Sequence, residues 1–523
     1  MHARRRVTLA GMESRRPLLR TGGSLLAAAA LLISGCSSGS SSTGASSSAL
    51  PASTPEGLEK YYDQKLDWRD CGVPGFQCST MRAPLDYEEP SAGDIKLAVA
   101  RKKATGPGKR LGTLQVNPGG PGGSAIEYLQ AYAGIGFPEP VRAQYDMVAV
   151  DPRGVARSEP VKCLDGARMD AYTETDMTPD DKGEQKQLVA SFKEFAQGCE
   201  KNSRRMLPHV STVEAARDMD VLRAALGDKK LQYVGASYGT FLGATYAGLF
   251  PQRTGRLVLD GAMDPSLPAR RMNRDQTAGF ETAFQAFARD CVKLKDCPLG
   301  TKSPADAGSR LKDFFRRLDS KPIPTGENRT LGEALATTGV IAAMYDEATW
   351  PQLRDSLTTA IKENDGSGLL ALSDSYYERE PNGKYANLMS ANAAVNCLDL
   401  PPAFKNPEDV VKGLPDFEKA SPVFGEGLAW ASLNCSNWPV DASGTAHRIQ
   451  AEDAAPILVV GTTRDPATPY KWAQALAGQL SSGTLLTYDG DGHTAYGRGS
   501  DCIDTAINRY LLEGKPPKDG KKC

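Results

Sequence analysis

One serine of this chain lies in a pattern that is typical of a nucleophile on a sharp turn. The sequence GASYG at 235–239 centres on Ser237, follows the apolar run 231–234 and precedes the helix-like stretch 240–250. A strand-to-helix turn of this kind exposes the serine hydroxyl, and the glycines on either side let the strand and the helix approach closely. Because G-x-S-x-G also arises by chance in glycine-rich chains, Ser237 needs partners before it predicts chemistry.

A general base for Ser237 must come from the four histidines of the chain, which are His2, His209, His447 and His493. In strand-turn-helix nucleophile sites the acid and then the base follow the serine along the chain, which leaves His447 and His493. His447 lies in the polar stretch 442–450, whereas His493 comes just after the strand-like segment 484–488. Catalytic groups belong on loops at the carboxyl ends of strands in an open α/β sheet, so His493 is the predicted base.

The third member of a Ser-His-Asp triad is expected on the preceding strand. The apolar run 456–461 reads as a buried parallel strand, and Asp465 lies in the loop that follows it. Asp465 is therefore the preferred partner that orients His493. A helix cap or turn carboxylate is the alternative for Asp465, since proline follows it directly. Asp489 and Asp491 compete for the role but are too close in sequence to reach His493 easily from behind.

Donors for a tetrahedral oxyanion are expected from a glycine-rich loop. The strand-like segment 112–116 runs into NPGGPGGS at 117–124. Such a loop exposes backbone N–H groups, and we expect the amides of Gly120 and Tyr238 to form the oxyanion hole. Phosphate binding is the alternative, but the glycine spacing fits neither G-x-G-x-x-G nor G-x-x-x-x-G-K-[ST].

These motifs carry a family resemblance. NPGGPG at 117–122, YDMVAVDPRGVARS at 145–158 and GASYG at 235–239 resemble α/β-hydrolase peptidases of the prolyl iminopeptidase type. The chain is more similar still to the secreted tripeptidyl aminopeptidases of actinobacteria and to the related mycobacterial cell-envelope serine proteases, also called carboxylesterases. Further matching segments lie at 259–265, 297–300, 349–351, 396–399, 435–439 and 463–469. Two departures are Ala156, where such enzymes usually have glycine, and Pro118, where prolyl iminopeptidases have histidine.

The expected fold class is α/β, namely an α/β-hydrolase fold with a mostly parallel sheet flanked by helices and an inserted, mainly helical cap domain. Alternating strand and helix patterns cover 58–265 and resume in 447–523, which we assign to the two parts of the hydrolase core. The range 266–446 has mostly helical periodicity and is the predicted cap. An independent domain there would leave Asp465 and His493 outside the core, which disfavours that reading.

The N-terminus predicts export. Arginines precede an apolar run and the sequence LISGC, so residues 1–35 read as a removed lipoprotein signal peptide. The resemblance to bacterial lipoprotein signals implies that Cys36 is lipidated and that 36–57 is a Ser/Gly-rich flexible tether. The enzyme would then sit on the outer face of the cell membrane, or be released to the medium. Plain secretion is the alternative; the start codon (Met1 or Met12) and the choice of general or twin-arginine export stay open.

The cysteines favour the same compartment. Removing Cys36 from the eleven leaves ten, and an exported chain is expected to oxidise them. Spacing does not fix connectivity, and nearest-neighbour pairing is the simplest choice. That choice joins Cys71 with Cys78, Cys163 with Cys199, Cys291 with Cys297, Cys397 with Cys435, and Cys502 with Cys523. Metal binding is disfavoured because no C-x-x-C occurs and few histidines are present, so no metal or other cofactor is expected.

The charge balance excludes one class of partner. Six of the 62 basic and one of the 63 acidic residues lie in 1–35, which leaves the remaining chain with a net charge of −6. An acidic balance argues against nucleic-acid binding. Membrane contact would come from the lipid rather than from a basic surface. A monomer is the favoured oligomeric state.

The triad alone does not select a substrate class, because the Ser-His-Asp chemistry suits any ester or amide. An aminopeptidase must also bind a free α-ammonium. The resemblance points to the predicted cap and its exit, where Asp399 in NCLD is the candidate carboxylate and Asp264 a weaker one. A capping or surface role is the alternative for each. The resemblance implies a serine aminopeptidase that releases short peptides, tripeptides in particular. A carboxylesterase or lipase with the same triad is the alternative enzyme, and a catalytically silent surface lipoprotein is the non-enzymatic one.

Overall fold

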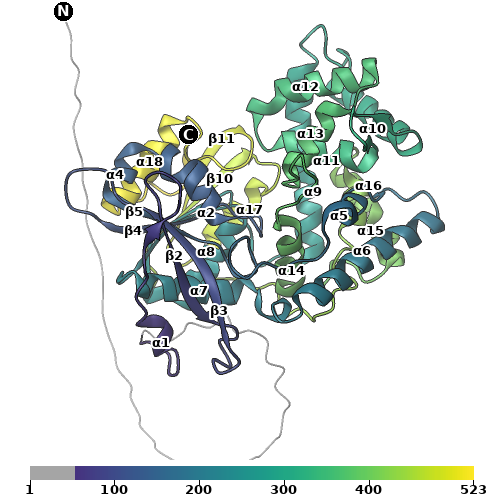
Figure 1. Cartoon of the computed structure of the whole chain (residues 1–523). Helices are drawn as coiled ribbons and strands as arrows, with labels where there is room; N and C mark the ends of the chain where they lie inside the picture. Colours follow the sequence, from purple (N-terminus) through teal and green to yellow (C-terminus); the bar gives the residue numbers. More distant parts are fainter. Residues whose placement is uncertain (1–52) are drawn as a thin grey trace, which may run out of the picture. The chain divides into compact units, whose positions relative to one another are not determined.

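Ten strands form one mixed sheet in the computed structural model, which describes residues 53–523 (Figure 1). β1 pairs antiparallel with β2, β2 with β3, and β3 with β5, whereas every pairing from β5 to β12 is parallel. This is the mostly parallel sheet that the sequence predicts. In spatial order the strands are β1 (Arg69–Asp70), β2 (Gln77–Pro84), β3 (Asp94–Lys102), β5 (Tyr145–Val150), β4 (Gly112–Asn117), β6 (Leu231–Ala236), β7 (Thr254–Asp260), β10 (Ile457–Arg464), β11 (Gly483–Asp491) and β12 (Lys521–Lys522).

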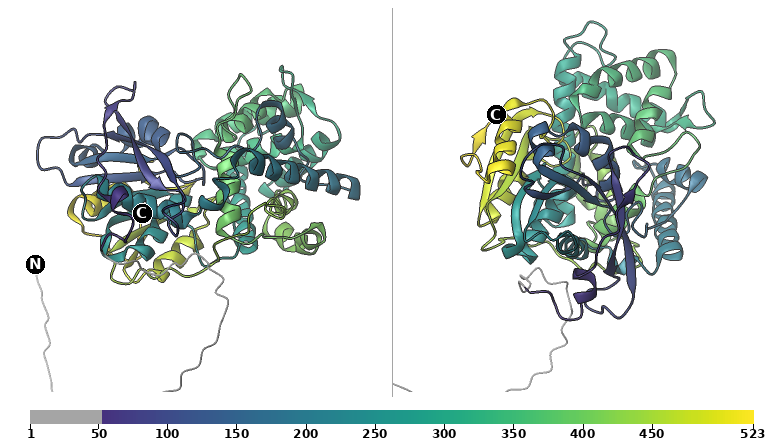
Figure 2. Two further views of the ribbon diagram at one scale, coloured as in Figure 1. Left: turned by 60° about the horizontal axis from the view of Figure 1, so that its bottom comes forward. Right: turned by 60° about the vertical axis from the view of Figure 1, so that its left-hand side comes forward.

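Helices cover both faces of this sheet (Figure 2). Along β7, Leu257 and Leu259 pack on one face with α7, α8 and α17, while Val258 packs on the other with α2, α4 and α18. Burial on both faces explains the continuous apolar runs of the central strands. The helices next to the sheet are α1 (Glu59–Tyr62), α2 (Ala125–Tyr128), α3 (Gly134–Gly136), α4 (Glu139–Gln144), α7 (Thr212–Ala225), α8 (Tyr238–Leu249), α17 (Tyr470–Gln479) and α18 (Asp501–Glu513), with the short turns η1 (Leu129–Ala133), η2 (Leu207–His209) and η3 (Pro251–Arg253).

A second group of helices has cores of its own. Phe284, Phe287 and Leu311 belong to a buried cluster formed within 280–424, separate from the two clusters on the sheet. Besides the small sheet of β8 (Ile323–Pro324) and β9 (Thr330–Leu331), this part is helical. Its helices are α9 (Ala269–Cys291), α10 (Pro304–Ser320), α11 (Glu333–Met344), η4 (Glu347–Thr349), α12 (Trp350–Thr358), η5 (Thr359–Glu363), α13 (Ser367–Tyr376), α14 (Leu388–Asp399), α15 (Pro407–Ala420) and α16 (Gly425–Ala431).

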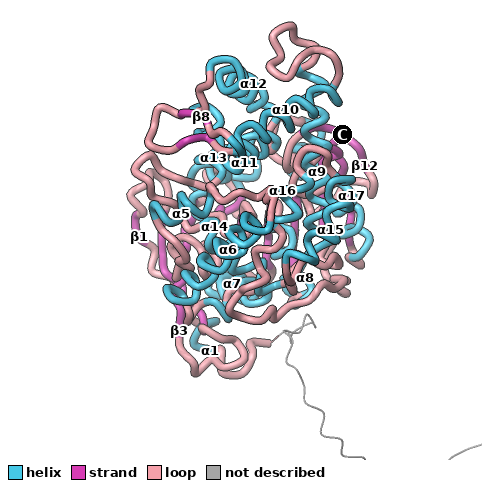
Figure 3. Tube along the Cα trace, turned by 90° about the vertical axis from the view of Figure 1, so that its right-hand side faces the viewer, coloured by secondary structure: helices cyan, strands magenta, loops and turns pink. Residues whose placement is uncertain are grey.

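Two helices of the first core range join this helical part. They are α5 (Gly166–Thr173) and α6 (Lys182–Ser203), which lie on the side of the helical part rather than on the sheet (Figures 1 and 3). Leu188 and Phe192 of α6 pack with Phe417 and Trp430 in one cluster. The expected range 58–265 therefore contains an excursion into the cap, and the exact domain boundaries stay a prediction.

Five disulfide bonds staple the described chain. They pair the ten cysteines as nearest neighbours, with Cα–Cα separations between 3.8 and 5.6 Å. Multiple disulfides are typical of an exported protein. Cys36 and the predicted signal peptide lie outside the described residues, as does the predicted tether as far as residue 52. Within residues 53–523, no helix is both long and apolar enough to cross a membrane.

A buried arginine ties the first strands to α7. Arg153 is 1% exposed and makes a bidentate pair with Asp218, at 2.7 and 2.8 Å, and a second ion pair with Glu214. Its remaining donors reach the carbonyls of Pro84, Leu85 and His209 at 3.0 Å. Planar bidentate pairing is the geometry that suits a guanidinium, so lysine would not replace it.

We expect Arg153→Leu to lower the free energy of unfolding by about 3–5 kcal/mol, because the carboxylates of Asp218 and Glu214 would stay buried without their cation. Arg168→Leu is the matched control: Arg168 pairs with Glu194 on the surface, where a pair contributes about 1 kcal/mol or less. Urea unfolding followed by circular dichroism measures both. Equal losses in the two variants would contradict the importance of the buried network.

Candidate active site

Ser237 lies between β6 and α8 in a conformation that serine rarely adopts, with φ 56° and ψ −124°. Its N–H donates to the carbonyl of Asp260 at 2.9 Å. The flanking glycines have a steric reason: a Cβ on Gly235 would lie 2.3 Å from the carbonyl oxygen of Gly239, and one on Gly239 would lie 2.9 Å from the side-chain oxygen of Asn117. The G-x-S-x-G pattern is therefore required by the backbone itself.

His493 and Asp465 lie side by side at the ends of two neighbouring strands. His493 Nδ1 is 2.9 Å from both carboxylate oxygens of Asp465. That carboxylate is fully buried and also accepts the N–H groups of Ala467 and Thr468 at 2.9 and 2.8 Å. Because an ionised carboxylate only accepts, it takes the proton on Nδ1 and leaves Nε2 as the basic nitrogen. Asp489 and Asp491, the competing acids, instead pair with Arg464.

The turn after β7 joins the serine and the histidine. Besides receiving the Ser237 N–H, Asp260 accepts the backbone N–H groups of Ala495 and Tyr496 on its side chain at about 3 Å. A Cβ on Gly261 would lie 3.2 Å from His493 Cε1. Asp260 is 3% exposed, and burial raises its pKa. Sequence reasoning missed this positioning residue, whose one signal is its place at the carboxyl end of a buried strand.

The helical part also holds the histidine loop. The N–H of His493 donates to the carbonyl of Tyr345 at 2.8 Å, and the two rings meet edge to face at 5.4 Å. Arg498 bridges the same two segments by donating to the His493 carbonyl and to the Asp346 carboxylate. The base is therefore fixed from the cap as well as from the sheet, a contact that sequence reasoning did not find.

The glycine-rich loop lies directly against the serine turn. A Cβ on Gly119 would lie 2.9 Å from the Tyr238 nitrogen, and Gly120 lines the same pocket as Ser237. Among residues 53–523, no acceptor takes the N–H of Gly120 or of Tyr238. Both amides are thus available to an oxyanion. From the cap, Asn392 donates to the carbonyl of Pro121 at 3.1 Å and braces this loop.

A pocket of about 220 Å³ opens at Ser237, between the sheet and the helical part. Its apolar wall includes Phe241, Met263 and Trp472, and its polar wall includes Asn396 and Asp399. A larger cavity of about 1100 Å³ lies beside α5, but Ser237 does not line it. Ser237 therefore faces the smaller pocket.

The two predicted amine-binding carboxylates differ in where they lie. Asp399, at the end of α14, lines the Ser237 pocket and accepts both the N–H, at 2.8 Å, and the hydroxyl of Thr212. Desolvation of this half-buried residue raises its pKa to about 7, although the Thr212 hydrogen bonds oppose the rise. Asp264 is 5% exposed, accepts from Ser266 and Gln479, and does not line the pocket. It serves the turn after β7.

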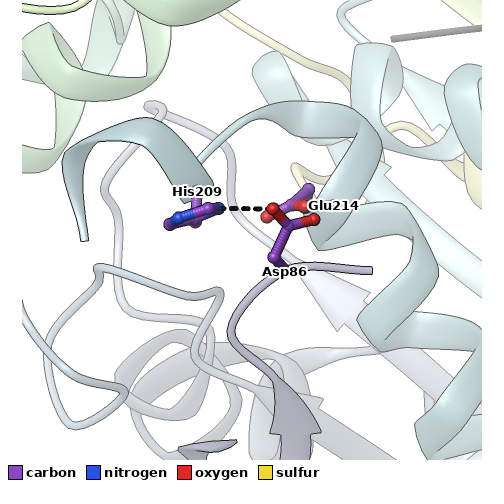
Figure 4. Close-up of side chains that lie close together, drawn as sticks. All are labelled: Asp86, His209 and Glu214. Carbon is purple, nitrogen blue, oxygen red and sulfur yellow. Dashed lines mark ion pairs between the residues drawn. The ribbon is translucent and has the colours of Figure 1, made fainter. Parts of the chain in front are cut away.

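The other described histidines lie elsewhere. His447 Nδ1 contacts the Thr445 carbonyl at 2.7 Å. His209 is 3.8 Å from Asp86 in a cluster completed by Glu214 (Figure 4). Burial lowers the pKa of His209 and raises that of Glu214 to about 7. This cluster and a second one, formed by Asp176, Asp319 and Glu333, are the two described groups with the spacing for a metal ion, and neither lines the Ser237 pocket.

Comparison with known proteins assigns the family. A family model described as "alpha/beta hydrolase fold" matches residues 113–343, and one described as "TAP-like protein" matches residues 421–523. Serine protease Hip1 of Mycobacterium tuberculosis is 37% identical over 493 residues, which cover 88% of this chain and 91% of that protein. The chain belongs to the TAP-like α/β-hydrolase family. The resemblance drawn from its motifs is confirmed.

Other relatives of this TAP-like hydrolase carry different names. Carboxylesterase B of Mycobacterium tuberculosis is 36% identical over 453 residues, covering 86% of each chain. Tripeptidyl aminopeptidase of Streptomyces lividans is 30% identical over 469 residues, covering 88% of this chain and 86% of that one. A solved structure of proline iminopeptidase from Mycobacterium smegmatis aligns over 83% of this chain and 98% of that one, with 14% identity and a TM-score of 0.34. The sequence relatives make the protein a serine hydrolase, a peptidase or an esterase.

The choice of acid is testable with two neighbouring aspartates. We expect Asp465→Asn to lower kcat about 10³- to 10⁴-fold, because an amide no longer fixes the imidazole tautomer or stabilises the imidazolium. Asp491→Asn, the matched control, removes a carboxylate that pairs with Arg464 and is expected to stay within a few-fold of wild type. Steady-state hydrolysis of one chromogenic substrate gives both values; a larger loss in Asp491→Asn would reverse the assignment.

Proposed function

We propose that this protein is an exported serine aminopeptidase that removes short peptides, tripeptides in particular, from free N-termini. The observation that carries the proposal is the carboxylate of Asp399, which shares a pocket with Ser237 and forms no ion pair within residues 53–523. A desolvated carboxylate without a cation is a site for an ammonium group, because the bound charge compensates the cost of desolvation. The name of the Streptomyces tripeptidyl aminopeptidase supports the same class.

We propose that these groups carry out acyl transfer. His493 removes the Ser237 proton through Nε2 as the hydroxyl attacks the carbonyl carbon, and Asp465 stabilises the resulting imidazolium. The oxyanion accepts hydrogen bonds from the amides of Gly120 and Tyr238. The imidazolium then protonates the leaving amine, the C–N bond breaks, and an acyl-enzyme forms on Ser237. Water activated by His493 hydrolyses the ester and restores the serine.

A carboxylesterase with the same triad is the second candidate. The apolar wall of Phe241, Met263 and Trp472 suits an acyl chain, and the name carboxylesterase B belongs to a 36% identical relative. An ester substrate has no ammonium and gains nothing from Asp399. The two functions therefore differ in how they respond to loss of this one charge.

Localisation belongs to the proposal as well. A lipid on Cys36 and a flexible tether over 36–57 would hold the enzyme at the outer face of the membrane, within reach of exported polypeptides. Mass spectrometry of the N-terminal peptide tests this anchor. A diacylglyceryl cysteine as first residue supports it, and an unmodified Cys36 would leave plain secretion.

The aminopeptidase is tested with a tripeptidyl arylamide, its N-acetylated analogue and p-nitrophenyl butyrate. We expect kcat/KM of the wild type to be at least about 100-fold higher for the free peptide than for the acetylated one. The acetylated peptide lacks the ammonium, and a buried charge left without its partner typically weakens binding by such a factor. Ser237→Ala should hydrolyse none of the three. Asp399→Asn should lose the preference, while Asp264→Asn, the matched control, should keep it.

Two outcomes would contradict this assignment. Turnover of the butyrate ester with neither peptide cleaved would favour the carboxylesterase. Equal cleavage of the free and acetylated peptides would show a peptidase that does not recognise the substrate's free N-terminal ammonium, and Asp399 would then be a structural carboxylate.

The pH dependence of peptide recognition follows from the raised pKa of Asp399. Below pH 7 the carboxyl group becomes protonated and cannot pair with an ammonium, so KM for the free peptide should rise about tenfold per pH unit. Above about pH 8 the substrate amine loses its proton and KM should rise again. The ratio of kcat/KM for the free and acetylated peptides cancels the titration of the base. A ratio that stays constant from pH 5.5 to 7 would contradict the role of Asp399.

A further inference from the structure

Three side chains from three helices form a hydrogen-bonded chain that begins at the pocket wall and runs into the interior. Thr212 Oγ1 contacts the Asp399 carboxylate on one side and lies 2.6 Å from the Tyr238 hydroxyl on the other. The Thr212 N–H holds the second carboxylate oxygen at 2.8 Å. Thr212 and Tyr238 are 1% and 4% exposed, so water does not compete for the bond between their hydroxyls.

The direction of this chain depends on the charge of Asp399. The Thr212 hydroxyl has a single proton, and an ionised carboxylate can only accept it. Tyr238 must then donate its phenol proton to Thr212, and burial raises the pKa of Tyr238, which keeps the phenol protonated. If Asp399 is protonated, it can donate to Thr212 instead, and Tyr238 becomes the acceptor.

The two ends of this hydrogen-bonded chain have different roles. Asp399 faces the pocket as the proposed ammonium site, while Tyr238 follows Ser237 directly and supplies an oxyanion-hole amide through its backbone. We propose that Thr212 is a positioning residue that joins recognition of the substrate ammonium at Asp399 to the oxyanion hole at Tyr238. This inference rests on the proposed aminopeptidase function.

The link has a kinetic consequence. A bound ammonium keeps Asp399 ionised and so fixes the direction of the two hydrogen bonds made by the Thr212 hydroxyl. The Tyr238 ring and the first turn of α8 are then held in one arrangement. That turn begins at the strained Ser237 backbone, where displacements of about 1 Å are costly to catalysis. The free amine should therefore raise kcat as well as lower KM, whereas simple binding of the amine would change KM alone.

The test compares Thr212→Val, which keeps the shape and the backbone N–H, with Thr212→Ser, which keeps the hydroxyl. Thr245→Val is the matched control, because Thr245 is a buried threonine of α8 whose hydroxyl has no hydrogen-bond partner among residues 53–523. The readouts are kcat and KM for the free and acetylated tripeptidyl arylamides between pH 5.5 and 8.5, with a thermal melt of each variant.

We expect Thr212→Val to reduce the free-to-acetyl ratio of kcat/KM about tenfold and to move its acidic midpoint up by about one pH unit, since a donor to the charged carboxylate is lost. Thr212→Ser should restore both within about twofold, and Thr245→Val should resemble wild type. Tyr238→Phe breaks only the second bond, so it should lower kcat for the free peptide about three- to tenfold with little change in KM.

The outcomes separate this inference from the proposed function. One outcome is that Asp399→Asn removes the preference for the free peptide while Thr212→Val leaves the free-to-acetyl ratio of kcat/KM and its acidic midpoint unchanged. In that case the link through Thr212 is wrong and the aminopeptidase proposal stands. If wild type shows no preference for the free amine, the proposed function fails first. Where Thr212→Val does not fold, Tyr238→Phe decides: an unchanged kcat for the free peptide would overturn the link.

Discussion

At Ser237 the backbone is held at φ 56°, which costs a residue with a side chain about 1–3 kcal/mol and therefore needs support from its surroundings. The support comes from Asp260, whose carbonyl accepts the Ser237 N–H, and from glycines at 235 and 239 that let the strand and helix meet. The same Asp260 carboxylate anchors the loop after His493. One residue at the end of β7 thus fixes the nucleophile and the base together.

The helical part is a structural component of the site and not only its cover. It accepts the His493 N–H at Tyr345, braces the glycine-rich loop through Asn392, and carries Asp399 into the pocket. These contacts come from two cap segments, the end of α11 and the helix α14, so the cap must dock on the sheet for the site to be complete. A scaffold of this kind lets the cap set substrate choice while the sheet keeps the acyl-transfer chemistry.

Local signals made the sheet, the strand-to-helix turn at Ser237 and the strand-end positions of Asp465 and His493 predictable, because such turns and buried parallel strands have distinctive short sequences. Contacts between distant segments have no such signal. Thr212 and Asp399 are 187 positions apart, and nothing near either residue indicates that they meet. The excursion of α5 and α6 was missed for a related reason: an amphipathic helix shows which face is buried but not against which partner.

A crystal structure of the Ser237→Ala variant with an uncleaved peptide that has a free N-terminus would show whether Asp399 binds the substrate ammonium. We expect the ammonium nitrogen to lie about 3 Å from the Asp399 carboxylate, with the scissile carbonyl oxygen within hydrogen-bond distance of the amides of Gly120 and Tyr238. A peptide whose N-terminus points to solvent while Asp399 remains bound only to Thr212 would contradict this expectation.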